Sequence, residues 1–414
     1  MASPPVHVCL VTPGHLASTP RLVKAANALT VSGYRVHVVA SRHFAPADPL
    51  DDAILSQAAW TCERVRFDAG MTGLLRRSLR LASRYWLARH PDIQCLAARA
   101  LHAGIAALAD AAARSGAGFY YGHGGVAGLA AAAAAAKRRG TTYGFDAEDW
   151  HEGESAFVQN DSAERAAVKS LLRSLLPGAR LVTCAAPLIG DAYAQHYGIS
   201  PVCVLNVFPL ADAPSAPVPT APPTNERPAI LYWFSQTVGA GRGLDGIVDA
   251  LGRMTTPAEL HLRGFVDPRF RESLEYRATA VGARPPVFLA PAPPAEMVRL
   301  AAGAHLGLSL EQSSPPNRDL CLTNKIFTYL LAGVPVALTP TTAQRALARE
   351  LGAAALLLAQ DDPSSAAATL DRWFAADQPG VAATAWRLGQ ERFNWDREQS
   401  ILLDVMTRSC PLFP

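Results

Sequence analysis

The sequence lacks the patterns of a disulfide-stabilised or zinc-stabilised fold. Its seven cysteines are scattered singly, and none belongs to a Cys-x-x-Cys pair. An odd number of isolated cysteines predicts neither a disulfide framework nor a zinc site, and it fits a reducing cytoplasm. No Asp-x-Asp motif lies in a loop suited to a metal ion. We therefore expect no resident metal ion and no other bound cofactor.

Long apolar runs are also missing. No segment approaches the roughly 18 apolar residues that a membrane-spanning helix needs. The first residues, MASPPVHVCLVTPGH, lack the charged and apolar regions of a signal peptide. The run LAAAAAAAK at 129–137 is short and alanine-rich, and it predicts a helix. We expect a cytoplasmic protein.

Charge of one sign is not in excess. Charged residues make up 18% of the sequence and the formal net charge is +3, so nothing general favours a nucleic acid as partner. Half of the residues are hydrophobic, and a chain of 414 residues has room for two domains of roughly 150–200 residues. The composition therefore indicates a compact α/β protein with two lobes.

The first half of the chain alternates strand patterns with helical ones. VHVCLVT (6–12) and RVHVVAS (35–41) flank a segment with helical spacing, which is the order of a βαβ unit. Further strands are expected at 118–123, 142–149 and 180–185. Such units build parallel sheets whose ligands bind at the carboxyl ends of the strands.

A proline-rich segment separates this pattern from a second one. Residues 211–228 can neither pair into a sheet nor propagate a helix, so we interpret them as a linker after an N-terminal domain at 1–210. Residues 229–392 then form a second domain, and 393–414 a helix that packs back on the body. Strands of the second domain are expected at 229–235, 259–265, 286–291, 305–311 and 334–339.

Particular motifs in the first half resemble the acceptor domain of the family-four-type retaining glycosyltransferases. They are STPRLVKAANALTVSGYRVHVVA (18–40), YYGHGGVAGLAAAAAAAKRRG (120–140) and TTYGFDAEDWHEGE (141–154). GAGRGLDGIVDAL (239–251), the strand end LSLE at 308–311, and LTNKIFTYLLAGVPVALT (322–339) are similar to the nucleotide-sugar domain of that family. The resemblance implies α/β GT-B architecture, in which two doubly wound Rossmann-like domains face each other across a cleft.

The same resemblance assigns roles to residues of the second domain. Arg242 and Gly243 lie where the family binds the donor diphosphate, and Lys325, with Asn324 as its N-cap, stands at the start of a later helix. Cations and helix N-termini stabilise the charge of a departing diphosphate. Glu311 is expected to accept hydrogen bonds from hydroxyls of the donor sugar. A second basic residue of the family is missing near Gln236, and Thr328 replaces its ribose-binding glutamate.

The expected acceptor side lies in the first domain. By resemblance it includes Asp146, Glu148, His151, His123 and His15. A carboxylate at the end of a parallel strand can orient a hydroxyl or accept its proton, so Asp146 and Glu148 are catalytic candidates. The alternative is that these acids cap the next helix and that His123 is structural. The family usually has histidine at the position of Glu148, glutamate at that of Asp149 and aspartate at that of Gly124.

Residues 71–90 form a separate feature. MTGLLRRSLRLASRYWLARH places five arginines among leucines and aromatic residues. This composition suits a helix on an anionic membrane or one that grips a lipid-diphosphate acceptor, and it equally suits a solvated basic helix face.

These observations predict a glycosyltransferase that uses a nucleotide sugar and a glycan or lipid-linked acceptor, at the inner face of the membrane. We expect it to be metal-independent and retaining. Two alternatives remain open, namely a nucleotide-sugar 2-epimerase and a non-catalytic nucleotide-binding scaffold for polysaccharide assembly. A nicotinamide dehydrogenase is disfavoured because TPGHLAS, after the first strand, lacks the three-glycine fingerprint.

Overall fold

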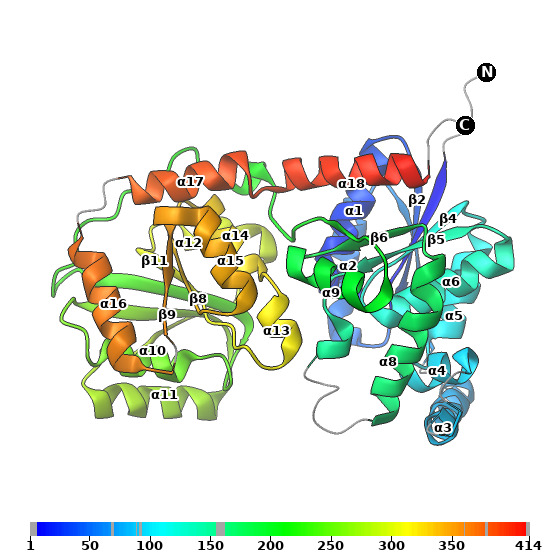
Figure 1. Ribbon diagram of the computed structural model, residues 1–414, viewed down its shortest axis with the longest axis horizontal. Helices are drawn as coiled ribbons and strands as arrows, with labels where there is room; N and C mark the ends of the chain where they lie inside the picture. Colours follow the sequence, from blue (N-terminus) through cyan, green and yellow to red (C-terminus); the bar gives the residue numbers. More distant parts are fainter. Residues whose placement is uncertain are drawn as a thin grey trace. The chain divides into compact units, whose positions relative to one another are not determined.

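The protein consists of two compact units. The computed structural model describes residues 6–67, 70–87, 89–90, 93–154, 162–359, 361–376 and 380–410. Unit 1 comprises Met1–Leu205, Pro315–Asn317 and Gln399–Pro414, and unit 2 comprises Asn206–Ser314 and Arg318–Glu398. Each unit contains one parallel sheet with helices on its faces (Figure 1).

The sheet of unit 1 has seven strands in the order β3-β2-β1-β4-β5-β6-β7. The strand order reverses between β1 and β4, so the carboxyl ends of these two strands mark the usual ligand position of an open α/β sheet. The strands are β1 (His7–Val11), β2 (Arg35–Ser41), β3 (Thr61–Val65), β4 (Phe119–Gly122), β5 (Thr142–Ala147), β6 (Leu181–Cys184) and β7 (Val202–Cys203).

Helices cover both faces of this sheet because each parallel connection must cross one face. α6 packs against both α5 and α8, and α3 and α4 lie at the margin of the unit beside α8 (Figure 1). The helices are α1 (Pro20–Val31), α2 (Asp48–Leu55), α3 (Gly70–Leu87), α4 (Gln94–Leu101), α5 (Ile105–Arg114), α6 (Val126–Arg139), α8 (Ser162–Leu175) and α9 (Pro187–Tyr197).

The sheet of unit 2 has six strands in the order β10-β9-β8-β11-β12-β13. Its core contains Leu231, Trp233, Leu260 and Leu308, which are fully buried on neighbouring strands. The strands are β8 (Ala229–Val238), β9 (Ala258–Val266), β10 (Val287–Leu289), β11 (Leu306–Ser309), β12 (Val336–Leu338) and β13 (Ala355–Leu357). The order reverses between β8 and β11, which places the expected ligand position at their carboxyl ends.

α10, α11 and α16 lie on one face of this sheet, and α12, α14 and α17 lie on the other (Figure 1). The helices of the second half are α10 (Leu244–Leu251), α11 (Pro268–Val281), α12 (Met297–Ala301), α13 (Pro316–Leu320), α14 (Asn324–Leu331), α15 (Thr342–Leu351), α16 (Pro363–Ala375), α17 (Val381–Glu391) and α18 (Trp395–Ser409).

The division between the units differs from the sequence prediction. It falls at Leu205, and the proline-rich segment belongs to unit 2. This segment is held there because Pro214 accepts a hydrogen bond from the indole of Trp386, and Ala221 contacts the ring of His305. Such contacts to carbonyl groups need no backbone N–H from proline.

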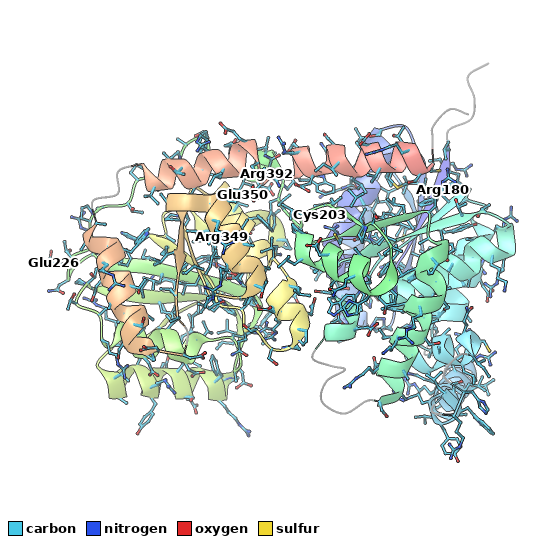
Figure 2. All side chains as sticks on the ribbon, in the orientation of Figure 1. Arg180, Cys203, Glu226, Arg349, Glu350 and Arg392 are labelled. Carbon is cyan, nitrogen blue, oxygen red and sulfur yellow. The ribbon has the colours of Figure 1, made fainter. Side chains whose placement is uncertain are left out.

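α18 begins in unit 2 and continues into unit 1. Just before its first turn, Arg392 pairs with Glu350, both labelled in Figure 2, and with the buried Glu398. At its other end, Nε of Arg180, which is labelled in Figure 2, donates to the carbonyl of Ser409 at 2.6 Å. The Tyr34 hydroxyl donates to the carbonyl of Cys410 at 3.0 Å. The helix expected at the C-terminal end is therefore tied to side chains from both halves of the chain.

All ten strands expected from sequence are present, and the alanine-rich run lies in α6. The sequence prediction missed three strands, β3, β7 and β13. Each of these strands lies at the edge of its sheet and has only one neighbouring strand. Their residues are mostly half-buried, so they lack the continuous apolar runs of central strands. Among the described residues no single helix is long and apolar enough to span a membrane, although α4 and α5, bent by 104° to each other, pass that test as a pair.

Candidate functional site

The carboxyl edge of the unit 1 sheet is built on close contacts between backbone segments. A Cβ atom at Gly128 of α6 would lie 1.9 Å from the carbonyl oxygen of His123, so the helix lies directly against the end of β4. Gly124 has a φ of +68°, and a Cβ there would lie 2.6 Å from Thr12 Oγ1 in the loop after β1. Only glycine fits at these two positions.

The buried ion pair of Arg21 and Asp146 is the centre of this edge. Arg21 Nε and Nη2 donate to the two carboxylate oxygens of Asp146 at 2.6 and 2.9 Å. Arg21 Nη1 also donates to the carbonyl of Val204 at 2.6 Å, and the Thr183 hydroxyl donates to Asp146 at 2.6 Å. Although burial alone would raise it, the pKa of Asp146 is held far below its usual range by Arg21 and His123. Asp146 is thus ionised and fully bonded inside the protein.

His123 and His151 each keep one ring nitrogen without a partner among the described residues. Nδ1 of His123 lies 3.2 Å from Asp146, and Nδ1 of His151 lies 2.8 Å from Glu154. Both Nε2 atoms are buried and unbonded. A Cβ at Gly125 would lie 3.4 Å from Cε1 of His151, so both rings adjoin the N-terminus of α6. Buried nitrogen atoms without a partner are uncommon, so each Nε2 is a position at which a further hydrogen bond can form.

Carboxylates surround these rings. Partial burial raises the pKa of Glu148 to about 7, because it outweighs the opposing charge of Arg21, and Asp146 and Asp149 add to the rise. Burial lowers the pKa of His151, but the hydrogen bond and charge of Glu154 outweigh it and raise the pKa above the ordinary value. Glu148 therefore exchanges its proton close to neutral pH, as a general base must.

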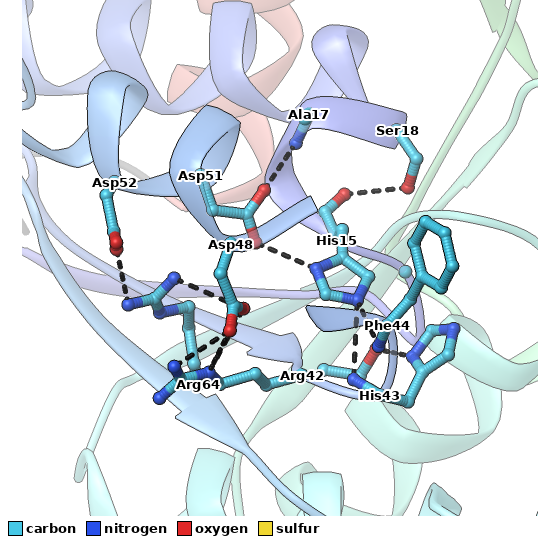
Figure 3. Close-up of polar contacts among 12 residues, drawn as sticks. His15, Ala17, Ser18, Arg42, His43, Phe44, Asp48, Asp51, Asp52 and Arg64 are labelled. Atoms are coloured by element: carbon cyan, nitrogen blue, oxygen red, sulfur yellow. Dashed lines mark hydrogen bonds and ion pairs between the residues drawn. The ribbon is translucent and has the colours of Figure 1, made fainter. Parts of the chain in front are cut away.

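His15 has a structural position that the sequence did not predict. Its Nδ1 lies 3.0 Å from the buried carboxylate of Asp51, and its Nε2 accepts from the backbone N–H groups of His43 and Phe44 (Figure 3). Asp51 also accepts from the backbone N–H of Ala17 at 2.8 Å (Figure 3). Because both ring nitrogens are engaged, His15 joins the loop after β1 to the loop after β2.

In unit 2, Glu311 and Lys325 meet at the carboxyl edge of the sheet. Glu311 follows β11, Lys325 lies in the first turn of α14, and both are buried. Lys325 Nζ is 3.5 Å from Glu311 Oε1 and 5.8 Å from the centre of the Trp233 ring. The ammonium group therefore has one carboxylate and one aromatic face as neighbours, and its remaining donors are available to an anion.

A second row of polar side chains fixes this pair. The Thr339 hydroxyl donates to the backbone carbonyl of Glu311, and Ser309 Oγ lies 3.3 Å from Thr323 Oγ1. Gln344 Nε2 donates to Ser309 Oγ at 3.2 Å, while its Oε1 is buried without a described partner. The sequence analysis missed these residues because they come from separate strands and helices, with no shared motif.

Arg242 lies in the loop between β8 and α10. β8 pairs directly with β11, so this loop and Glu311 follow neighbouring strands at one edge. Gly241 and Gly243 have φ values of +73° and +74°, and Gly243 is the N-cap of α10. Arg242 is half-buried, and no carboxylate among the described residues pairs with it. The loop thus presents a cation beside a helix N-terminus, which is an arrangement that binds phosphate.

The first turn of α14 differs from the prediction in one respect. The N-cap is Thr323, and Asn324 is the first helical residue, so the expected capping role of Asn324 is wrong by one position. Thr328 is fully buried, and its hydroxyl donates to the carbonyl of Asn324 at 3.0 Å. Thr328 is therefore part of the helix interior. The described residues include no group of three or more His, Cys, Asp or Glu side chains that could hold a metal ion.

Sequence comparison with family models and with curated proteins finds no match. Comparison with solved structures finds several over nearly the whole chain. HepE from Anabaena, solved with UDP and glucose, has a TM-score of 0.69 at 15% identity, over 97% of this chain and 100% of that one. Sucrose-phosphate synthase from Thermosynechococcus elongatus has a TM-score of 0.67 at 14% identity, over 97% and 98% of the two chains.

A protein from Listeria monocytogenes proposed to be a UDP-N-acetylglucosamine 2-epimerase is similar to a smaller degree. Its TM-score is 0.53 at 12% identity, over 99% of this chain and 97% of that chain. Identities this low show the fold alone. The chain therefore has the two-sheet α/β fold of GT-B glycosyltransferases, as the sequence predicts.

Proposed function

We propose that this protein is a glycosyltransferase that moves a sugar from a nucleotide-sugar donor to a glycan or lipid-linked acceptor. The observation that carries the proposal is the buried pair of Glu311 and Lys325 at the carboxyl edge of the unit 2 sheet. A buried cation beside a carboxylate suits a ligand that has both a diphosphate and sugar hydroxyls. Arg242 and the N-terminus of α10, after the neighbouring strand, supply further positive charge.

The roles in this mechanism follow from charge. When the bond between the sugar and the diphosphate breaks, negative charge grows on the leaving group, and Lys325 and Arg242 stabilise it. Glu311 accepts hydrogen bonds from hydroxyls of the sugar, and Gly243 and Asn324 line the donor position. Because side chains and backbone amides carry the stabilisation, we propose that no metal ion is needed. Chelators should leave turnover unchanged.

Unit 1 is the proposed acceptor side. Glu148, with a pKa near 7, is suited to accept a proton from the acceptor hydroxyl, and the free Nε2 atoms of His123 and His151 are suited to bind that acceptor. Asp146 acts indirectly in this scheme because it holds Arg21 and His123 in place. His15, through Asp51, fixes the adjacent loop.

A donor panel is the direct test. Each nucleotide sugar is screened for the rise in melting temperature that a ligand of the native state produces. The best donor is then incubated with candidate glycans and lipid-linked sugars at the cytoplasmic pH. We expect one donor to stabilise the protein and to release its nucleoside diphosphate together with a new glycoside. NMR of the anomeric proton in that product tests retention of configuration.

The same assay separates the two alternatives. A 2-epimerase, favoured by the Listeria structure, would isomerise the donor when no acceptor is present. A scaffold for polysaccharide assembly would bind the nucleotide without turnover, and the loss of the family's ribose glutamate at Thr328 favours that alternative. Transfer to an acceptor contradicts both.

The lipid-linked acceptor and a location at the inner face of the membrane are part of the proposal. They depend on residues 71–90, which the sequence singles out as a basic, leucine-rich helix.

A further inference from the structure

α3 carries an unusual number of apolar side chains on its exposed face. Fourteen large hydrophobic side chains are exposed among the described residues, and six of them lie on this one helix. Leu81, Leu74 and Trp86 have exposed fractions of 69%, 64% and 50%. The six residues, which we name the α3 patch, are Leu74, Leu75, Leu79, Leu81, Tyr85 and Trp86.

An ordinary surface helix buries its apolar side, whereas α3 exposes most of its large apolar side chains. Gly73, Ser83 and Leu87 are buried against the rest of unit 1, and the helical repeat of 3.6 residues puts the α3 patch on the other side. Two of the arginines face the protein, since Arg76 donates to the carbonyl of Phe67 at 3.2 Å and Arg80 donates to that of Ala100 at 3.1 Å. Arg77 and Arg89 remain exposed, so the outer side of this segment carries apolar side chains together with arginines.

Apolar side chains of this number on one helix are a feature of interaction surfaces. The charge of the segment decides between occupants. Residues 70–90 contain five arginines and no aspartate or glutamate. In a symmetric dimer through this patch, positive charge would meet positive charge, which opposes self-association. An anionic lipid surface has the opposite charge and accepts the apolar side chains.

The aromatic residues favour the same occupant. Tyr85 and Trp86 lie at the C-terminal end of the patch, where the Arg89 guanidinium stacks over the Tyr85 ring at 4.0 Å and the Trp86 ring stacks on His90 at 5.9 Å. Tyrosine and tryptophan collect at the boundary between headgroups and acyl chains, and arginine there reaches phosphate groups.

We infer that the α3 patch inserts into the surface of an anionic phospholipid bilayer and holds the protein there. Insertion of the six apolar side chains supplies most of the affinity, and the arginines at the flanks add attraction to the headgroups. High salt therefore weakens the binding without abolishing it. The further step, that this surface brings the enzyme to a lipid-linked acceptor, rests on the proposed function.

Flotation of the full-length protein with lipid vesicles tests the inference. One set of vesicles is phosphatidylcholine, and the other is phosphatidylcholine mixed with phosphatidylglycerol. The test variant is Leu75→Gln combined with Trp86→Gln. The matched control is Phe265→Gln combined with Tyr276→Gln, because these side chains in unit 2 are similarly exposed, at 69% and 78%. All four sites are exposed, so the melting temperatures should remain the same.

We expect the wild type and the control to bind the anionic vesicles, and the α3 variant to bind at least about tenfold more weakly. Equal binding by the α3 variant, or no binding by the wild type, would overturn the inference. A dimer in light scattering that the α3 variant dissociates would also overturn it, since the patch would then bind a second copy.

Failure of the proposed function has a different signature. Vesicle binding that requires the α3 patch, without sugar transfer from any donor, refutes the enzyme assignment alone. Sugar transfer to a water-soluble acceptor by a protein that ignores vesicles refutes the membrane surface alone.

Discussion

The charged side chains at the carboxyl edges of the two sheets differ in how completely they are paired. In unit 1, Asp146 is bonded on every side, to Arg21, to Thr183 and to His123. In unit 2, Lys325 has a single carboxylate at 3.5 Å, and Arg242 pairs with no described carboxylate. The charges of Arg21 and Asp146 are therefore satisfied within the protein, whereas Lys325 and Arg242 have donors left for a ligand.

This contrast separates residues that build a site from residues that bind in it. A bidentate ion pair with further hydrogen bonds holds its side chains in one geometry, and breaking it leaves an uncompensated charge. A loosely paired cation contributes less to folding and more to the binding of an anion. We therefore expect substitution of Arg21, in the paired edge of unit 1, to reduce stability, and substitution of Lys325, in the edge of unit 2, to reduce turnover.

The largest effect on stability is expected for Arg21→Ala. The substitution leaves Asp146 buried without its cation, and the free energy of unfolding should fall by about 3–5 kcal/mol. Arg277→Ala is the matched control, since Arg277 makes a bidentate but exposed pair with Asp249 and its loss should cost about 0–1 kcal/mol. Urea denaturation measures both. An equal fall in the free energy of unfolding in the two variants would show that the buried pair contributes no more to stability than the exposed pair.

The pH dependence of this difference has a definite sign. Because the pKa of Asp146 is lowered on folding, its contribution is complete above the pKa of an unfolded carboxyl, about 4, and is lost as the pH falls below that value.

The largest effect on turnover is expected for Lys325→Met. Removing a charge that stabilises the leaving diphosphate should lower kcat by about 10²–10³. Lys137→Met, on the exposed last turn of α6, controls for loss of a lysine. Initial rates with the donor found by the thermal screen measure both variants. A Lys325→Met enzyme with unchanged kcat would exclude the proposed role in charge stabilisation.

Glu148→Gln should have a smaller effect that depends on pH. As a general base Glu148 must be ionised, so kcat/KM of the wild type should rise with pH up to about pH 7 and then level off. The variant should lose this dependence and be slower by about 10² at pH 8. A pH profile that keeps the same limb after substitution would assign the titration to another group.

The smallest effect is expected for Asp51→Asn. The amide keeps the size of the side chain but weakens the hydrogen bonds to His15 and Ala17, which should cost about 1–2 kcal/mol of unfolding free energy. Asp52→Asn, at the neighbouring exposed carboxylate, is the control. Thermal denaturation of both variants measures the difference, and equal melting temperatures would contradict a structural role for Asp51.

The central strands could be predicted because burial on both faces requires continuous apolar runs, and VHVCLVT is such a run. The donor edge could be predicted in part, since Glu311 and Lys325 lie in motifs whose order is visible in the sequence. The pairing of His15 with Asp51 could not, because they are 36 positions apart and α1 and β2 lie between them. Arg21 and Asp146 are 125 residues apart, and no local pattern joins them.

The orientation of α3 could not be predicted from the sequence either. Its composition gives the number of arginines and leucines, but it does not say which side of the helix meets the protein. That is decided by small residues such as Gly73 and Ser83, which allow close packing, and by carbonyl groups that receive Arg76 and Arg80.

The course of α18 has a consequence for synthesis on the ribosome. Unit 1 includes the segment from Gln399 onward, and unit 2 lies between that segment and Leu205. The ribosome must therefore synthesise all of unit 2 before Ser409 can reach Arg180. A fragment that stops at Leu205 lacks this part of unit 1, so separate expression of unit 1 requires that the two pieces be joined by a new connection.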